Sequence, residues 1–172
     1  MSPVSIIDGV RTPHGRFLGG LASETAIDLG EVALTDLLDR TAIDPAAIDW
    51  VALGNALSAG VGQAPARQVA VESPLPDGVA ATTIDEASGS GLRALALGAD
   101  RIEAGRADVA VVGGTESMSN APYLLPDLRR GRRHGDAAAV DAMIRDGLWD
   151  RSSDAHMGAL TERLVDRFGV SR

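Results

Sequence analysis

Cysteine is absent from the 172-residue sequence, and its absence excludes several kinds of site. Without cysteine there can be no disulfide framework, no thiolate metal site and no thiol nucleophile. Long apolar runs are also missing, so no segment is predicted to span a bilayer, and the N-terminus lacks the apolar core of a signal peptide. We therefore expect a cytoplasmic protein with no membrane partner and no metal site.

Aromatic residues and positive charge are scarce as well. Aromatics make up 3% of the sequence, so a core must be built from Ala, Val, Leu and Ile. The formal net charge is −8, which argues against a nucleic-acid partner or an anionic membrane surface. One basic cluster, 129–133, breaks this balance locally. A solvated loop is the simpler interpretation of this cluster; a contact to a phosphate-bearing ligand or a neighbouring subunit is the alternative.

Segments with strand and helix character alternate along the first two thirds of the chain. This alternation predicts an α/β fold with helices packed on a sheet. The segment 109–112 shows no in-and-out alternation, so we expect a strand buried on both faces. The expected strands are Pro3–Asp8, Trp50–Asn55, Val79–Ile84 and Val109–Val112, and the expected helices run from an N-cap at Ser23 to about Arg40, then Ala64–Glu72 and Gly89–Ala104.

The character of the sequence changes after Met118. No convincing strand follows, but two amphipathic pieces lie at 140–148 and 160–168. We therefore divide the chain into an α/β core, residues 1–118, and a loop subdomain, residues 119–172.

Several motifs, each weak alone, occur together in an order that resembles one family. The most informative is Ala87-Ser88-Gly89-Ser90-Gly91, which leads from a β-branched segment into an Ala/Leu-rich helix. Together these motifs resemble the N-terminal half of a thiolase, and the resemblance covers essentially the whole chain. The other motifs are Arg11-Thr12-Pro13, the segment 60–68 (GVGQAPARQ), the segment 113–122 (GGTESMSNAP), the segment 143–148 (MIRDGL) and His156-Met157-Gly158.

The resemblance implies a βαβαβα half of a thiolase-like fold with the family's loop subdomain. It implies acyl-CoA thioesters as substrates, in Claisen condensation or thiolysis, with no permanently bound cofactor. Ser88 falls on the acyl-accepting nucleophile, and Leu148, His156 and Met157 fall on positions that line the pocket for coenzyme A and the acyl group.

Two departures from the family pattern affect the expected chemistry. Ser88 stands where the family has cysteine, and a hydroxyl needs a strong neighbouring base that a thiol does not. Asp85 and Glu86 add negative charge beside it, which opposes ionisation of the nucleophile. The family's catalytic histidine and second cysteine belong to a C-terminal half. We therefore expect an enzyme that works only with a second polypeptide carrying that half, in a dimer or tetramer of such units.

Other interpretations of these residues remain open at this stage. The chain could be a non-catalytic thiolase-like subunit that binds acyl-CoA, or a serine-dependent acyltransferase. Ser88 could simply cap the following helix. We expect surface or structural roles for His14 and His134, which lie in loops, and we expect Glu116 to be a structural, hydrogen-bonded carboxylate.

Overall fold

The computed structural model describes residues 3–171, which form two compact units. The first unit ends at Asn120 and the second begins at Ala121. The first unit contains α1 (Ala26–Thr41), a 3₁₀ helix (Pro45–Ala47), β1 (Trp50–Gly54), α2 (Pro65–Glu72), β2 (Ala80–Ile84), α3 (Ser90–Glu103), β3 (Ala110–Gly114) and a 3₁₀ helix (Met118–Asn120).

The three strands form one parallel sheet in the order β2-β1-β3. Gly54 at the end of β1 pairs with both Ile84 of β2 and Gly114 of β3, so all three strands end at the same edge. The chain first moves outward from β1 to β2, then crosses back over β1 to reach β3. Because the two β-α-β connections have the same hand, α2 and α3 lie on opposite faces of the sheet. The predicted α/β class is confirmed.

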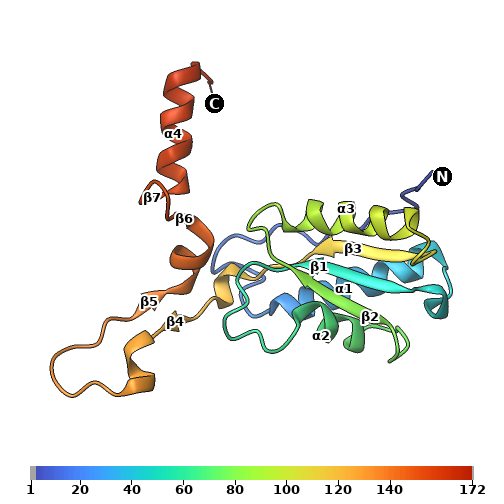
Figure 1. Ribbon diagram of the computed structural model, residues 1–172, viewed down its shortest axis with the longest axis horizontal. Helices are drawn as coiled ribbons and strands as arrows, with labels where there is room; N and C mark the ends of the chain where they lie inside the picture. Colours follow the sequence, from blue (N-terminus) through green and yellow to red (C-terminus); the bar gives the residue numbers. More distant parts are fainter. Residues whose placement is uncertain (1–2, 172) are drawn as a thin grey trace. The chain divides into compact units, whose positions relative to one another are not determined.

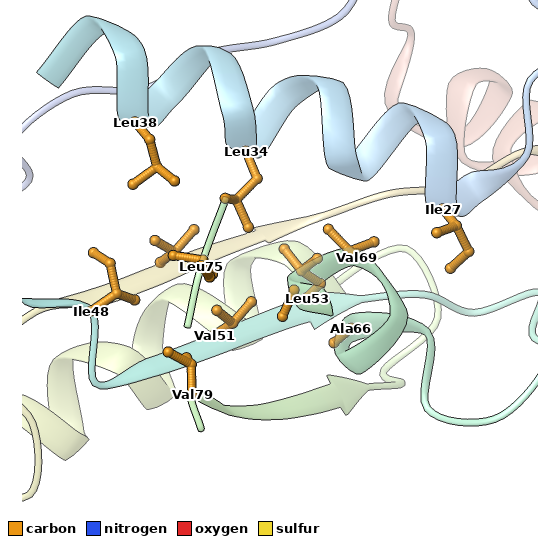
Figure 2. Close-up of a cluster of buried hydrophobic side chains, with 12 residues drawn as sticks. Ile27, Leu34, Leu38, Ile48, Val51, Leu53, Ala66, Val69, Leu75 and Val79 are labelled. Carbon is orange, nitrogen blue, oxygen red and sulfur yellow. The ribbon is translucent and has the colours of Figure 1, made fainter. Parts of the chain in front are cut away.

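Helices cover both faces of this sheet, with α3 on one face and α1 and α2 on the other (Figure 1). Figure 2 shows how α1 directs Leu34 and Leu38 toward Val51 of β1. On the opposite face, Trp50 and Ala52 of the same strand pack with α3. Successive residues of β1 therefore enter two different apolar clusters, and β1 is buried along its whole length.

The prediction for Val109–Val112 is wrong in one respect. The strand forms, but its residues are mostly half-buried, whereas β1 is the strand that is fully buried. The reason is position: among the described residues β3 has a neighbour on one side only, while β1 lies between two strands. An apolar run cannot by itself distinguish these two positions.

The expected strand at Pro3–Asp8 does not form. Residues 3–16 adopt neither helix nor strand, and Ile6 and Ile7 are exposed. A strand is stabilised by hydrogen bonds to a neighbour, and this segment pairs with no other strand within residues 3–171. Local β-propensity alone is not sufficient to form a strand at Pro3–Asp8.

The first helix begins two residues later than predicted, because Thr25 rather than Ser23 is its N-cap. The Thr25 hydroxyl accepts a hydrogen bond from the Asp28 N–H at 3.1 Å, and the Asp28 carboxylate accepts one from the Thr25 N–H at 2.8 Å. This reciprocal pair is a capping box. The Thr25 hydroxyl and N–H both lower the pKa of the Asp28 carboxyl group. Ser23 instead donates to the side chain of Glu24.

The second unit is made of short elements. Two antiparallel pairs of two-residue strands, which the sequence did not indicate, lie around a π-helical turn. The second pair is closed by a turn in which the Ser153 and Ser152 side chains lower the pKa of Asp150 to about 2. The elements are β4 (Tyr123–Leu124), a 3₁₀ helix (Pro126–Arg130), β5 (Val140–Asp141), the π-helix (Met143–Leu148), β6 (Trp149–Asp150), β7 (Ala155–His156) and α4 (Met157–Phe168).

The basic cluster 129–133 lies at the end of the 3₁₀ helix and in the loop that follows, and its side chains are exposed. Arg132 forms an ion pair with Asp127 at 2.9 Å. In the described part of the chain, no helix combines the length and the apolar character that crossing a membrane requires.

Candidate active site

A polar residue follows each strand at the carboxyl edge of the sheet. Asn55, Asp85 and Thr115 directly follow β1, β2 and β3, which end in register. In open parallel sheets, ligands bind outside the carboxyl ends of the strands. The connection from β2 to α3, which carries Ser88, lies at this edge.

Ser88 is exposed in the turn between β2 and α3. Its hydroxyl makes no hydrogen bond to any other residue between positions 3 and 171. The N-cap of α3 is Gly89, without a side-chain hydrogen bond, so the interpretation of Ser88 as a helix cap is wrong. The hydroxyl is left free for an external group.

The turn that presents Ser88 is conformationally unusual. Ala87 has φ 48°, in the left-handed region that alanine rarely adopts. Non-glycine residues persist there only when their surroundings hold them, and such residues are enriched at functional sites. The turn therefore depends on contacts with its neighbours.

The negative charges of Asp85 and Glu86, beside Ser88, are partly offset by neighbouring groups. Glu86 forms an ion pair with Arg93 in the first turn of α3, with 2.9 Å between Oε1 and Nε. Asp85 accepts a hydrogen bond from the Ala87 N–H at 3.0 Å. Both partners of the Glu86–Arg93 pair are about half exposed, so the pair contributes little to stability, but it places a positive charge near the turn that carries Ser88.

Helix α3 starts in very close contact with the sheet. A Cβ atom on Gly54 would lie 2.6 Å from the Ser90 Cβ and 2.8 Å from the Gly91 nitrogen. No L side chain fits in that distance, so only glycine at the end of β1 allows α3 to begin here. The position of the Ser88 turn is therefore set by a contact with a strand more than thirty residues away in sequence.

Glu116 joins the loops after β1 and β3. Its carboxylate accepts hydrogen bonds from the Asn55 side chain at 2.9 Å and from the N–H groups of Ala56 and Leu57 at 2.9 and 3.1 Å. The structural interpretation of Glu116 is confirmed. Asn55 also donates to the Thr115 carbonyl at 3.1 Å, while its own Oδ1 atom is buried with no partner among the described residues.

The three expected pocket residues all lie in the second unit. His156 is half-buried and caps α4, its Nδ1 accepting a hydrogen bond from the Gly158 N–H at 3.0 Å. A neutral imidazole that accepts at Nδ1 carries its proton on Nε2, and this N–H has no hydrogen-bond partner among residues 3–171. Met157 is exposed and Leu148 is half-buried. Ser88 belongs to the first unit.

The remaining histidines are at the surface, as predicted. His14 Nδ1 lies 2.9 Å from an Arg11 guanidinium nitrogen, and His134 is exposed. Within residues 3–171, no group of three His, Asp or Glu side chains is placed to hold a metal ion.

Comparison with known proteins gives consistent matches over the whole chain. Residues 4–172 match the family described as thiolase, N-terminal domain. The cytosolic acetyl-CoA acetyltransferase ERG10 of Gibberella zeae is 48% identical over 172 residues, covering all of this chain and 43% of that protein. The acetyl-CoA acetyltransferase of Pseudomonas aeruginosa is also 48% identical, with 44% of its length covered.

A solved structure shows the same fold. The crystal structure of the Acat5 thiolase from Ascaris suum in complex with coenzyme A superposes with a TM-score of 0.89 at 37% identity. The superposition covers 96% of this chain and 43% of that one. The chain thus spans less than half the length of the relatives it matches.

Proposed function

Since this chain belongs to the thiolase family through its N-terminal domain, we propose that it is the acyl-accepting half of an acyl-CoA C-acyltransferase. The observation that carries the proposal is Ser88, exposed with a free hydroxyl at the carboxyl edge of the sheet. In the proposed step, Ser88 Oγ attacks the thioester carbonyl and the carbon–sulfur bond breaks. The hydroxyl proton leaves with the thiol of coenzyme A, and the acyl group remains on Ser88 as an oxoester.

Serine at this position favours a slow or trapped acyl-enzyme. A hydroxyl is a weak nucleophile without an adjacent base. Once formed, the oxoester is a poorer electrophile than a thioester for a carbon nucleophile or for returning coenzyme A. Helix α3 begins two residues after Ser88, so the positive end of its dipole would stabilise the developing oxyanion and assist the first step.

We further propose that the missing base is supplied by a C-terminal half on a second polypeptide, in a dimer or tetramer of such units. The outer face of α3 supports this, since Leu92 is 76% exposed and Leu95 39% exposed. Exposed apolar surface of this kind is typical of an interface. In this assembly Leu148, His156 and Met157 would line the pocket for coenzyme A. We place the protein in the cytoplasm, where its fungal relative is named as cytosolic.

A second candidate function is a non-catalytic subunit that binds acyl-CoA. It is favoured by one observation: no base within residues 3–171 hydrogen-bonds the Ser88 hydroxyl. A serine-dependent acyltransferase that uses an acceptor other than carbon is the third possibility.

Mass spectrometry of the intact protein after incubation with acetyl-CoA tests these alternatives. The chain is co-expressed with the part of the Pseudomonas aeruginosa relative that lies outside the matched segment. We expect one acetyl group on the wild type and on a Ser5→Ala control, which removes another exposed serine. We expect none on Ser88→Ala, and faster acetylation with release of product on Ser88→Cys.

Each alternative predicts a different result. Coenzyme A bound without any adduct would favour the non-catalytic subunit. Acetyl transfer from Ser88 to an alcohol or amine, with no condensation even after Ser88→Cys, would favour the serine-dependent acyltransferase. Full condensation activity in the 172-residue chain alone would contradict the need for a second half.

A further inference from the structure

We propose that Ser90 is a positioning residue, which holds the turn that presents Ser88 in its reactive conformation. The inference rests on the proposed function, because it assigns Ser90 a role toward the acyl-accepting group. The sequence pattern does not indicate this role, although it places a second hydroxyl two positions after Ser88.

The Ser90 hydroxyl links the end of the turn, at residue 90, to its beginning at Glu86 and Ala87. Its hydroxyl donates to the Ala87 carbonyl at 2.6 Å and accepts from the Glu86 N–H at 2.8 Å. Two backbone hydrogen bonds run in parallel, from Gly89 N–H to the Glu86 carbonyl at 3.0 Å and from Ser90 N–H to the Ala87 carbonyl at 3.2 Å. The Ser90 side chain therefore completes a closed set of hydrogen bonds around Ser88, and none of these bonds is made to Ser88 itself.

These hydrogen bonds hold the backbone at Ala87 in a conformation that is unfavourable for alanine. Ala87, immediately before Ser88, has φ 48°. An alanine released from the Ser90 hydroxyl would relax toward negative φ. That rotation would change the direction in which the following residue leaves the turn. The orientation of Ser88 relative to the start of α3 therefore depends on the Ser90 hydroxyl.

Ser90 is itself held in place. It is 4% exposed, and its Cβ lies against the end of β1, where even a methyl group on Gly54 would come within 2.6 Å. With its Cβ fixed against β1, the hydroxyl can leave Ala87 and Glu86 only by rotation about χ1, which would break both hydrogen bonds of a buried polar group. A buried polar group with both of its hydrogen bonds satisfied fixes a single local geometry.

The absence of cysteine from the chain allows a direct test that needs no acyl transfer. The Ser88→Cys variant introduces a single thiol at the site. Its pKa is measured from the pH dependence of iodoacetamide alkylation, followed by mass. The start of a helix lowers the pKa of a thiol, so we expect a value below the ordinary ~8.5.

Adding Ser90→Ala should move this thiol pKa upward by about half a unit or more, with a roughly threefold loss of alkylation rate at neutral pH. The matched control is Ser73→Ala. Ser73 is also buried, at 6% exposure, and its hydroxyl also donates to a backbone carbonyl, that of Val69, at 2.6 Å. We expect the control to lower the melting temperature similarly but to leave the thiol pKa unchanged.

Equal thiol pKa values in the Ser90→Ala and Ser73→Ala backgrounds would overturn the proposal. If Ser90→Ala fails to fold, Ala87→Gly provides the second variant, since glycine adopts positive φ without strain. Added to Ser90→Ala, it should restore folding, and the thiol pKa should still lie above that of the Ser88→Cys protein that retains Ser90; equal pKa values in these two proteins would also overturn the proposal.

This readout is independent of acyl transfer. An unacetylated Ser88 would therefore contradict the proposed function while leaving the Ser90 measurement valid. Conversely, an acetylated Ser88 with an unchanged thiol pKa would contradict the role of Ser90 alone.

Discussion

Glu116 illustrates, at the scale of a single residue, how a charged group can serve the site without reacting. Its carboxylate accepts three hydrogen bonds from the loop that follows β1, two of them from backbone N–H groups. Hydrogen bonds to a charged acceptor are stronger than those between neutral groups. Glu116 therefore fixes the distance between two of the loops that surround the site.

Replacing Glu116 by glutamine should destabilise the protein by about 1–3 kcal/mol, because an amide nitrogen would face the Ala56 and Leu57 N–H groups or the charge-assisted bonds would be lost. Urea denaturation of the variant measures the change. Glu103→Gln is the control, since this side chain is exposed at the end of α3 and should change stability by less than about 0.5 kcal/mol. Equal effects of the two substitutions would contradict a bridging role for Glu116.

At the scale of elements, the beginning of α1 is determined by side-chain hydrogen bonds rather than by the apolar pattern. Thr25→Ala should destabilise the protein by about 0.5–2 kcal/mol, because it removes the cap and the partner of Asp28. Ser23→Ala, two residues earlier, should have almost no effect. Guanidinium denaturation distinguishes the two.

The cost of Thr25→Ala should also depend on pH. The Asp28 pKa is lowered in the folded state below its ordinary value of 3.8, so its contribution is present above that pH and is lost as the pH falls through the lowered pKa. Repeating the denaturation at acidic pH should therefore shrink the difference between wild type and variant. A constant difference would contradict the capping box.

The same elements show what local sequence information can predict. The helix at 65–72 and the strands of the sheet were recognised because their apolar residues and their bounding proline lie close together in sequence. The run at Pro3–Asp8 was misjudged because a strand depends on a neighbour that propensity does not reveal. The role of Ser90 was missed for a related reason: it depends on Gly54, which only the folded sheet brings next to it.

At the scale of the whole molecule, the exposed face of α3 stands out because its apolar side chains Leu92 and Leu95 are not covered within this chain's described residues. In the proposed assembly this face is covered by the C-terminal half. Leu92→Glu should then prevent co-purification with that half, while changing the stability of this chain by less than about 0.5 kcal/mol, since the side chain is exposed.

Val32→Glu is the matched control for that experiment, because Val32 is also exposed and apolar but lies on α1, on the opposite side of the sheet. We expect this variant to assemble normally in analytical ultracentrifugation. If both variants assemble, or if both fail to, α3 is not the specific contact.

The strand order β2-β1-β3 also has a kinetic consequence. The strand in the middle is made first, but its second neighbour comes from a segment about sixty residues further along the chain. Folding rates fall as contacts become more distant in sequence. During synthesis β1 therefore emerges long before β3 can pair with it, and its apolar residues stay accessible to chaperones and to aggregation until then.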